Sequence, residues 1–480
     1  MTPFNLYQIG SISDLVSITV SDVLVHRMAE GLGFNWYASY APETYPDPRD
    51  EERWQRIFTH VDWLNMGFIR FIQHGSSICD QAGNFIPGHA SFDQLCRLNA
   101  WAEEHGAAIV LDPFVIPKPH QYTPWDGAPT LWDSGEYQLG VRDLDAYVSR
   151  FIVPYVRFVV EDLRCRAVAW FNHVNEPLRG GTAATPLGID DHRHYVETLA
   201  AVRQGLDEAG LARIGNIGPD THTLQYWPIP HMLEMDADPD AYIQAYCMHQ
   251  YHSHFDWDAP SNALHHSEPM TKTIEEQLTP FCQYAHQRGK PFFMTELGMF
   301  HYGWERGDPA GIARHDNTIL EAEFIVRALN RGADAVLRWS WLNPGTLDGW
   351  WQLIQTTDGS DAPVRDPYST YSTLLRAIDR EAQIIQVNVS CPSAPQTIHA
   401  VAVINQDGSH SLVVVNDDYS NCAAVTITFP VGGASCVRKI VTDPVRKYHR
   451  YAEIPCSGGL MDYADCLSPM SLTVFTTKPI

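Results

Sequence analysis

Two glutamates in the 480-residue chain stand where a pair of carboxyl groups could act together on a substrate. Glu176 ends the stretch FNHVNE at 171–176, and Glu296 lies in MTELG at 294–298. Each follows a short apolar run of the kind that forms a buried strand. Cleavage of a glycosidic bond needs two such groups, because one protonates the leaving oxygen while the other attacks the sugar or activates water. The pair therefore indicates glycoside chemistry, provided that the fold brings the two glutamates together.

Eight short apolar segments could form the strands that position these glutamates. They alternate with amphipathic helical stretches, and this repeated order predicts parallel strands joined by right-handed crossovers. The predicted strands are 33–38, 67–72, 108–112, 167–172, 214–219, 243–249, 291–295 and 335–341. The predicted helices are 50–65, 91–105, 142–163, 191–209, 228–235, 271–288, 313–330 and 368–380. The pattern predicts an α/β fold, a (β/α)8 TIM barrel, in which Glu176 on the fourth strand faces Glu296 on the seventh at the carboxyl-terminal, catalytic end.

A second, all-β domain is predicted after the barrel, because helical periodicity gives way to alternating strands there. These strands are 383–390, 398–405, 411–416, 423–429, 437–442 and 472–477. The segment LVSITVSDVLV at 15–25 also resembles a strand and could close the barrel floor or join the second domain, which we favour. The predicted division is an N-terminal strand segment at 1–31, a catalytic barrel at 32–381 and an antiparallel β-sandwich at 382–480.

The residues around both glutamates resemble those of clan A of the glycoside hydrolases, the retaining (β/α)8 enzymes. The resemblance rests on Asn-Glu-Pro at 175–177 and Thr-Glu-Leu-Gly at 295–298, and it extends over roughly residues 32–350. Family 5 is the nearest match, while families 30, 39 and 79 also carry a β-sandwich. The resemblance implies that Glu176 is the acid/base and that Glu296 is the nucleophile of a double displacement at a β-type O-glycosidic bond.

The resemblance also implies roles for residues around the two glutamates. Arg70 on the second strand would steady the nucleophile, Tyr251 would donate a hydrogen bond to it, and Asn175 would bind the sugar 2-hydroxyl. A tryptophan of the eighth strand would floor the subsite of the cleaved sugar. Trp339 and Trp341 are predicted to share one face of that strand, so at most one is expected to be this platform and the other to belong to the core.

Four further residues at the ends of predicted strands could line the pocket, namely Asn35, Trp36, His173 and His249. Asp112 ends the third strand, where it could bind sugar or cap a loop. A histidine-rich segment at 249–256 offers ligands for zinc. Clan A chemistry needs no metal, however, so we expect no metal and no cofactor.

The composition narrows the range of partners. The chain has 33 basic and 57 acidic residues and a formal charge of −24, which repels phosphate backbones and argues against nucleic-acid binding. No stretch is apolar enough for a transmembrane helix, so no membrane partner is expected. The first residues lack the pattern of a signal peptide, which predicts a cytoplasmic protein with secretion left open. The oligomeric state and the pairing of the C-terminal cysteines stay open.

We therefore expect a retaining glycosidase with a carbohydrate substrate. Long segments follow the third, fourth and eighth strands, at 113–140, 178–189 and 343–366, and could close a pocket around a short chain end. This favours exo action on oligosaccharides or glycosides. The alternatives are an endo-acting glycanase of the mannanase or glucanase type and, less favoured, a non-catalytic carbohydrate-binding barrel.

Overall fold

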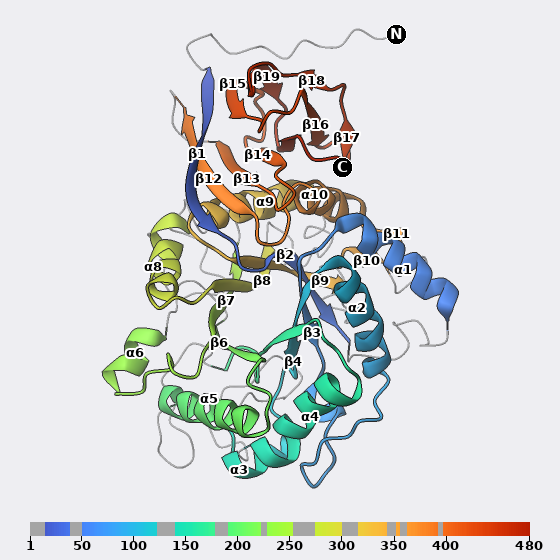
Figure 1. Ribbon diagram of the computed structural model, residues 1–480, viewed down its shortest axis with the longest axis vertical. Coiled ribbons are helices and arrows are strands. Elements are labelled where there is room, and N and C mark those ends of the chain that lie inside the picture. The colour runs from blue at the N-terminus through green and yellow to red at the C-terminus, as the bar shows by residue number, and fades with distance from the viewer. Residues whose placement is uncertain are drawn as a thin grey trace.

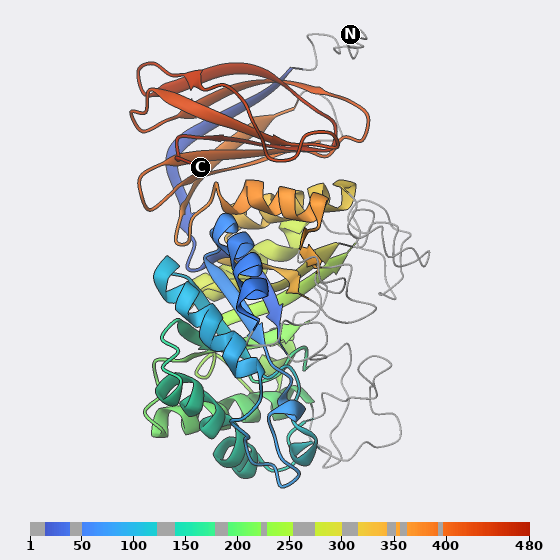
Figure 2. The same cartoon turned by 90° about the vertical axis from the view of Figure 1, so that its right-hand side faces the viewer.

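The computed structural model describes residues 15–38, 50–121, 140–177, 191–221, 228–252, 274–299, 315–342, 352–355, 362–391 and 397–480. A barrel ringed by helices carries a β-rich unit on one side (Figure 1). Figure 2 shows the strands of this unit in two layers, with α9 (His315–Asn330) and α10 (Arg365–Leu375) between them and the barrel. The predicted combination of a TIM barrel and a C-terminal β-sandwich is confirmed.

The barrel closes through eight strands that follow one another in chain order. They are β2 (Gly31–Tyr37), β3 (Phe68–Ile72), β4 (Ala108–Asp112), β5 (Val168–Phe171), β6 (Gly215–Thr221), β7 (Ala245–His252), β8 (Phe292–Met299) and β9 (Ala335–Leu342). Each strand is parallel to the next, and β9 returns to β2. All eight overlap the predicted strands, because a parallel sheet buried on both faces leaves continuous apolar runs in the sequence.

The helices pack on the barrel through apolar stripes. In α1 (Glu51–Leu64) the buried residues recur three and four apart, which places them on one face; they are Trp54, Ile57, Val61 and Leu64. The other helices are α2 (Ser91–His105), α5 (Asp191–Glu208), α6 (Ile229–Glu234) and α8 (Ile274–Gln287). The predicted helix at 142–163 runs through α3 (Leu144–Tyr147), a π-helical turn (Val148–Ile152), α4 (Val153–Arg157) and a second π-helical turn (Phe158–Asp162). Short elements complete the set: 3-10 turns at Gly75–Ser77 and Lys118–His120, and the hairpin of β10 (Ile354–Gln355) with β11 (Ala362–Pro363).

The inward face of the strands changes from apolar to polar toward their carboxyl-terminal ends. On β3, Ile69 and Phe71 join the core beneath the helices, whereas Phe68 packs inside the barrel. The Phe68 ring lies 5.1 Å from that of Phe293 on β8. Arg70 follows Phe68 by two residues and so lies on the same inward face. Apolar side chains therefore fill the barrel interior beneath a polar layer, which consists of Arg70 and the polar residues around it at the carboxyl ends of the strands.

The N-terminal strand β1 (Val16–Arg27) belongs to the sandwich. It pairs antiparallel with β12 and parallel with β15. The sheet order is β17, β16, β20, β14, β13, β12, β1, β15 and β19, with β18 paired to β16. Their bounds are β12 (Gln383–Ser390), β13 (Ile398–Ile404), β14 (His410–Asn416), β15 (Ala423–Pro430), β16 (Cys436–Thr442), β17 (His449–Arg450), β18 (Ile454–Pro455), β19 (Leu460–Leu467) and β20 (Ser471–Thr476). The sequence does not predict β17, β18 or β19.

The sandwich and the barrel share a hydrophobic core. Val413 and Val474 of the sandwich belong to the same buried cluster as the residues beneath the barrel helices. Polar contacts cross the junction as well: the Asn330 amide donates to the Ala400 carbonyl at 2.8 Å, and Arg376 Nε donates to the Tyr448 hydroxyl at 2.7 Å. The sandwich is thus packed against the barrel as a buttress.

The structure also bears on membrane-spanning helices and on disulfide bonds. Among the described helices, none combines the length and apolar character that crossing a membrane requires. All ten cysteines lie in the described part of the chain and are free thiols.

Candidate active site

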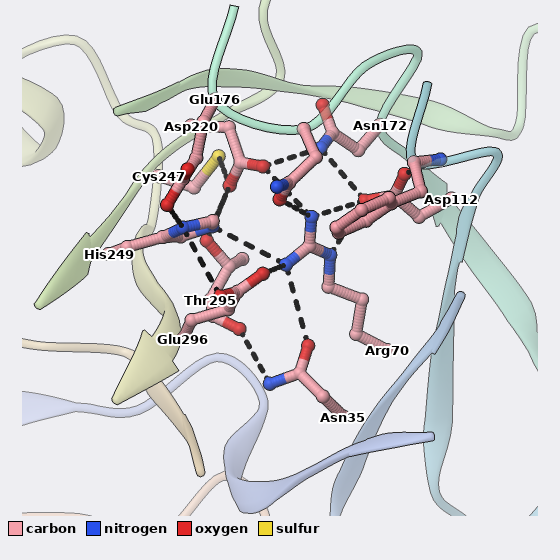
Figure 3. Close-up of polar contacts among 12 residues, drawn as sticks. Asn35, Arg70, Asp112, Asn172, Glu176, Asp220, Cys247, His249, Thr295 and Glu296 are labelled. Atoms are coloured by element: carbon pink, nitrogen blue, oxygen red, sulfur yellow. Dashed lines mark hydrogen bonds and ion pairs between the residues drawn. The ribbon is translucent and has the colours of Figure 1, made fainter. Parts of the chain in front are cut away.

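Arg70 occupies the centre of the polar layer and is fully buried (Figure 3). Its Nη1 donates to Glu296 Oε1 at 2.5 Å, and its Nη2 donates to Asn175 Oδ1 at 2.7 Å. Its Nε donates to Asp112 Oδ2 at 2.7 Å, and Nη2 lies 3.0 Å from Asp220 Oδ2. Burial alone would lower the pKa of Arg70, but these three carboxylates raise it well above its usual value. The guanidinium therefore stays charged. Through these contacts it links β3 to β4, β6, β8 and the segment that follows β5.

Glu296 on β8 is held at both carboxylate oxygens. Arg70 binds Oε1, and the Tyr251 hydroxyl donates to Oε2 at 2.5 Å. His249 Nδ1 lies 3.4 Å from the same Oε2. Burial raises the pKa of Glu296, while the charges of His249 and Arg70 and the Tyr251 hydroxyl act against that rise. The carboxylate is thus oriented by two hydrogen-bond donors and faces the His249 ring.

Glu176 lies just beyond β5 with a φ of 45°, in the left-handed region that non-glycine residues rarely adopt. Its Oε1 lies 2.9 Å from His249 Nδ1. One ligating atom from each of Glu176, His249 and Glu296 lies within 4.8 Å of the others. The fold therefore brings together the two glutamates that the sequence singled out, and both are nearly buried, with 6% and 4% of their surface exposed.

Most of the other predicted site residues surround this pair. Asn35 donates to the Thr295 carbonyl at 3.0 Å beside Glu296, and its Oδ1 lies 3.4 Å from Arg70 Nη1. Trp339 belongs to an apolar cluster with Tyr37 and Ile72, against which Tyr251 packs. The Trp339 and Tyr37 rings meet edge to face at 5.9 Å between centroids. Trp339 is thus placed beside the tyrosine that contacts Glu296.

Trp36 and Trp341 lie elsewhere, in the core between the barrel and its helices. Their rings stack at 6.2 Å with an interplanar angle of 17°, and Trp36 Nε1 donates to Gln94 on α2. The prediction that Trp339 and Trp341 share a face is wrong. The pairing of β9 with β2 jumps from Phe34–Arg338 to Trp36–Leu342, and this irregularity breaks the alternation between the two tryptophans.

His173 also points away from the glutamates. Its ring stacks on Tyr195 of α5 at 5.3 Å between centroids. Burial lowers the pKa of His173 to about 3, so the ring is neutral. It is a packing residue behind the segment that carries Glu176.

The sequence interpretation missed Asp220 and Asn172 and left Asp112 undecided. All three are buried around Arg70, and Asn172 Nδ2 donates to Asp112 Oδ2 at 2.9 Å and to Asp220 Oδ2 at 2.6 Å. The sequence feature that could have identified them is their position: Asn172 is the last residue of the predicted fourth strand, and Asp220 directly follows the fifth. Strand-end placement alone does not distinguish such residues from loop caps.

Two groups of described side chains lie close enough to share a metal ion. One is Glu176, His249 and Glu296, and the other is Glu323, His399 and Asp417 at the junction with the sandwich. A cation of the protein already contacts each group, since Arg70 pairs with Glu296 and Arg327 Nη1 pairs with Glu323 Oε1 at 2.6 Å. We assign neither group to a metal. Residues 253–273, which contain the rest of the predicted histidine-rich segment, lie outside the described residues.

Replacing Arg70 with Met is expected to destabilise the protein by about 3–5 kcal/mol, because three buried carboxylates lose their counter-charge. Urea unfolding at pH 7 measures the change. The control is Arg56→Met, which removes an exposed pair with Glu52 and should cost at most about 0.5 kcal/mol. Equal midpoints for Arg70→Met and the wild type would show that the polar layer does not stabilise the barrel.

The family model for cellulase, glycosyl hydrolase family 5, matches residues 48–345, which include every strand of the barrel except β2. No curated protein matches the sequence significantly.

Solved structures similar to this one cover nearly the whole chain. A GH30 endoxylanase from Clostridium papyrosolvens C71 has a TM-score of 0.62 and 16% identity, covering 96% of this chain and 99% of its own. The endo-β-1,6-glucanase BT3312 has a TM-score of 0.62 and 15% identity, with coverages of 96% and 92%. A glucosidase from Croceicoccus marinus has a TM-score of 0.61 and 11% identity, with coverages of 96% and 98%. Likenesses at these identities show a shared fold.

Proposed function

Because the chain belongs to glycosyl hydrolase family 5, it is a retaining O-glycoside hydrolase, and we propose that Glu296 is its nucleophile and Glu176 its acid/base. The observation that carries the retaining mechanism is the spacing of the two side chains, whose nearest oxygens lie within 4.8 Å. Retaining enzymes hold their carboxyl groups about 5–5.5 Å apart, whereas inverting enzymes need about 6.5–9.5 Å to admit a water.

The contacts of each glutamate support its proposed role. Glu296 receives hydrogen bonds from the Arg70 cation and the Tyr251 hydroxyl, which favour the ionised form that a nucleophile requires. Glu176 meets the His249 ring, a group that can itself hold or release a proton. This environment suits a carboxyl group that gives up a proton in one step and takes one back in the next.

The reaction proceeds in two displacements. In the first, Glu176 protonates the leaving oxygen while Glu296 attacks the anomeric carbon and forms a glycosyl ester. In the second, Glu176 accepts a proton from water, which attacks that ester and releases the sugar with its configuration retained. Arg70 Nη2 binds Asn175 Oδ1, so the amide nitrogen of Asn175 is the donor proposed to meet the sugar 2-hydroxyl.

Exo action on short β-glycosides is the finer part of the proposal. It rests on the long segments after the third, fourth and eighth barrel strands, most of whose residues lie outside the described part of the chain. Endo action is the second candidate, because two of the similar solved structures are those of an endoxylanase and an endo-β-1,6-glucanase.

Product analysis separates the two modes. Wild-type enzyme is offered a panel of aryl β-glycosides and arabinofuranosides and, separately, soluble β-glycans. For exo action we expect turnover of at least one aryl glycoside, and release of reducing sugar from polymers with little loss of viscosity. A rapid fall in viscosity with few reducing ends would establish endo action. Glu296→Ala, assayed in parallel, gives the uncatalysed background.

A further inference from the structure

Asp220 is a buried carboxylate of the polar layer that the proposed reaction does not use. It lies at the end of β6 with a φ of 52°, and its surface is fully inaccessible to solvent. Its two oxygens accept five hydrogen bonds, including one from Cys247 Sγ to Oδ1 at 3.4 Å. Oδ1 accepts from His249 Nε2 at 3.0 Å and Thr295 Oγ1 at 2.6 Å, and Oδ2 from Asn172 Nδ2 at 2.6 Å and Arg70 Nη2 at 3.0 Å. A group so enclosed acts on the reaction through its neighbours.

The contact with His249 determines which ring nitrogen carries a proton. An ionised carboxylate accepts hydrogen bonds and donates none, so Nε2 of His249 bears the hydrogen that points to Asp220 at 3.0 Å. Arg70 Nη1, which lies 3.4 Å from Nε2, is then a neighbouring donor and not its hydrogen-bond partner. The opposite nitrogen, Nδ1, is then directed at Glu176 Oε1, 2.9 Å away. The ring is therefore fixed between Asp220 and Glu176, as Figure 3 shows.

We propose that Asp220 is a positioning residue: by accepting the Nε2 hydrogen, it holds the His249 ring so that Nδ1 shares one proton with the acid/base Glu176. The proton lies either on Glu176 Oε1, with a neutral ring, or on Nδ1, with an ionised Glu176. The transfer moves one proton over one hydrogen bond and needs no other reactant. This inference rests on the proposed role of Glu176 as the acid/base.

The charges around His249 support the arrangement. Burial alone would lower the pKa of His249, but the charges of Asp220 and Glu296 raise it to about 10. Burial would raise the pKa of Asp220, but Arg70 and His249 hold it well below its usual range. The titratable and charged groups that face the ring come from β3, β6, β8 and the end of β5; they are Arg70, Asp220, Glu296 and Glu176. Asp220 thus remains an anion over the working pH range.

Asp112 provides a matched control for Asp220. It is equally buried, it pairs with Arg70, and it accepts a hydrogen bond from Asn172 Nδ2 at 2.9 Å. Its remaining described hydrogen bond is with the Phe114 N–H, not with His249. Asp112→Asn therefore removes an anion that lies beside Arg70, whereas Asp220→Asn removes an anion that lies beside both Arg70 and the His249 ring.

The first test compares the pH dependence of kcat/KM for the wild type, Asp220→Asn and Asp112→Asn. Loss of the anion beside His249 weakens proton binding by the Glu176–His249 pair, so the basic limb should move about 1–3 pH units toward lower pH in Asp220→Asn. In Asp112→Asn it should move by less than half as much. Equal shifts in both variants, or a uniform loss of activity without a shift, would overturn the proposal and would mean that Asp220 only supports Arg70.

A second test reads the ring directly in the wild-type enzyme and applies even if Asp220→Asn fails to fold. The imidazole nitrogens of ¹⁵N-histidine-labelled protein are titrated by NMR, and His249 is assigned by the signal missing from His249→Gln. We expect a protonated Nε2 throughout pH 5–9. An unprotonated Nε2 in that range would overturn the proposal. This result is independent of the role of Glu176, which is tested separately by Glu176→Ala.

Discussion

Replacing Glu296 with Ala is expected to reduce kcat for an aryl β-glycoside by on the order of 10⁵–10⁶-fold, as removal of a covalent nucleophile does. The substitution also leaves space where the carboxylate stood. Azide can enter there and attack the anomeric carbon from the same face, so added azide should restore turnover. The product is expected to be the glycosyl azide of inverted configuration, which NMR identifies.

Glu30→Ala is the matched control for that experiment. Glu30 is a glutamate with 4% of its surface exposed, but it lies just before β2, at the opposite end of the barrel, where it pairs with Arg380 Nη2 at 2.8 Å. Glu30→Ala should be less stable than the wild type. The folded variant should keep its activity on the aryl β-glycoside, and azide should not change that activity. Activity of Glu296→Ala within tenfold of the wild type would place the nucleophile elsewhere.

The barrel is readable from the sequence because its strands are buried on both faces and end in polar residues. β4 (Ala108–Asp112) illustrates this: Ile109 and Leu111 pack beneath the helices, Ala108 and Val110 fill the interior, and the strand stops at a carboxylate. The same logic finds Glu176 and Glu296, because polar groups at the carboxyl ends of parallel strands converge in a closed barrel.

The missed strand β19 shows where such patterns lose their signal. Its sequence LMDYADCL is fully buried at Met461 and Leu467, while Asp462 and Asp465 are partly or fully exposed. Met461, Tyr463 and Leu467 alternate into the sandwich core, but Asp465 takes one of the inward positions, and the strand pairs with β15 over eight residues. Backbone pairing of this kind leaves little trace in residue types.

Asp220 was missed for a different reason, since its importance depends on contacts between distant segments. It meets Arg70, 150 residues away, and Thr295, 75 residues away. The sequence shows a single aspartate after a predicted strand, which is equally typical of a loop. The pair Trp339 and Trp341 fails similarly, because a change of register between β2 and β9 decides which of them faces the mouth.

Replacing Glu176 with Ala is expected to affect substrates according to their leaving groups. Loss of general acid catalysis should lower kcat/KM by about 10²–10⁴-fold for alkyl or sugar leaving groups, which need protonation. A dinitrophenyl glycoside, whose leaving group departs as a stable anion, should lose little in the first step. Its second step should become slow because no base activates water, so a burst of phenol should precede a slow steady state with a low KM.

Azide distinguishes the two glutamates in a single assay. In Glu176→Ala the nucleophile Glu296 is intact, so azide attacks the glycosyl-enzyme from the opposite face and the expected product is the azide of retained configuration. Glu296→Ala should give the inverted azide from the same substrate. Equal losses for activated and unactivated leaving groups, together with an inverted azide from Glu176→Ala, would mean that the two roles are exchanged. Because Arg70 and Tyr251 both bind Glu296, whereas Glu176 meets His249, the structure favours the assignment proposed above.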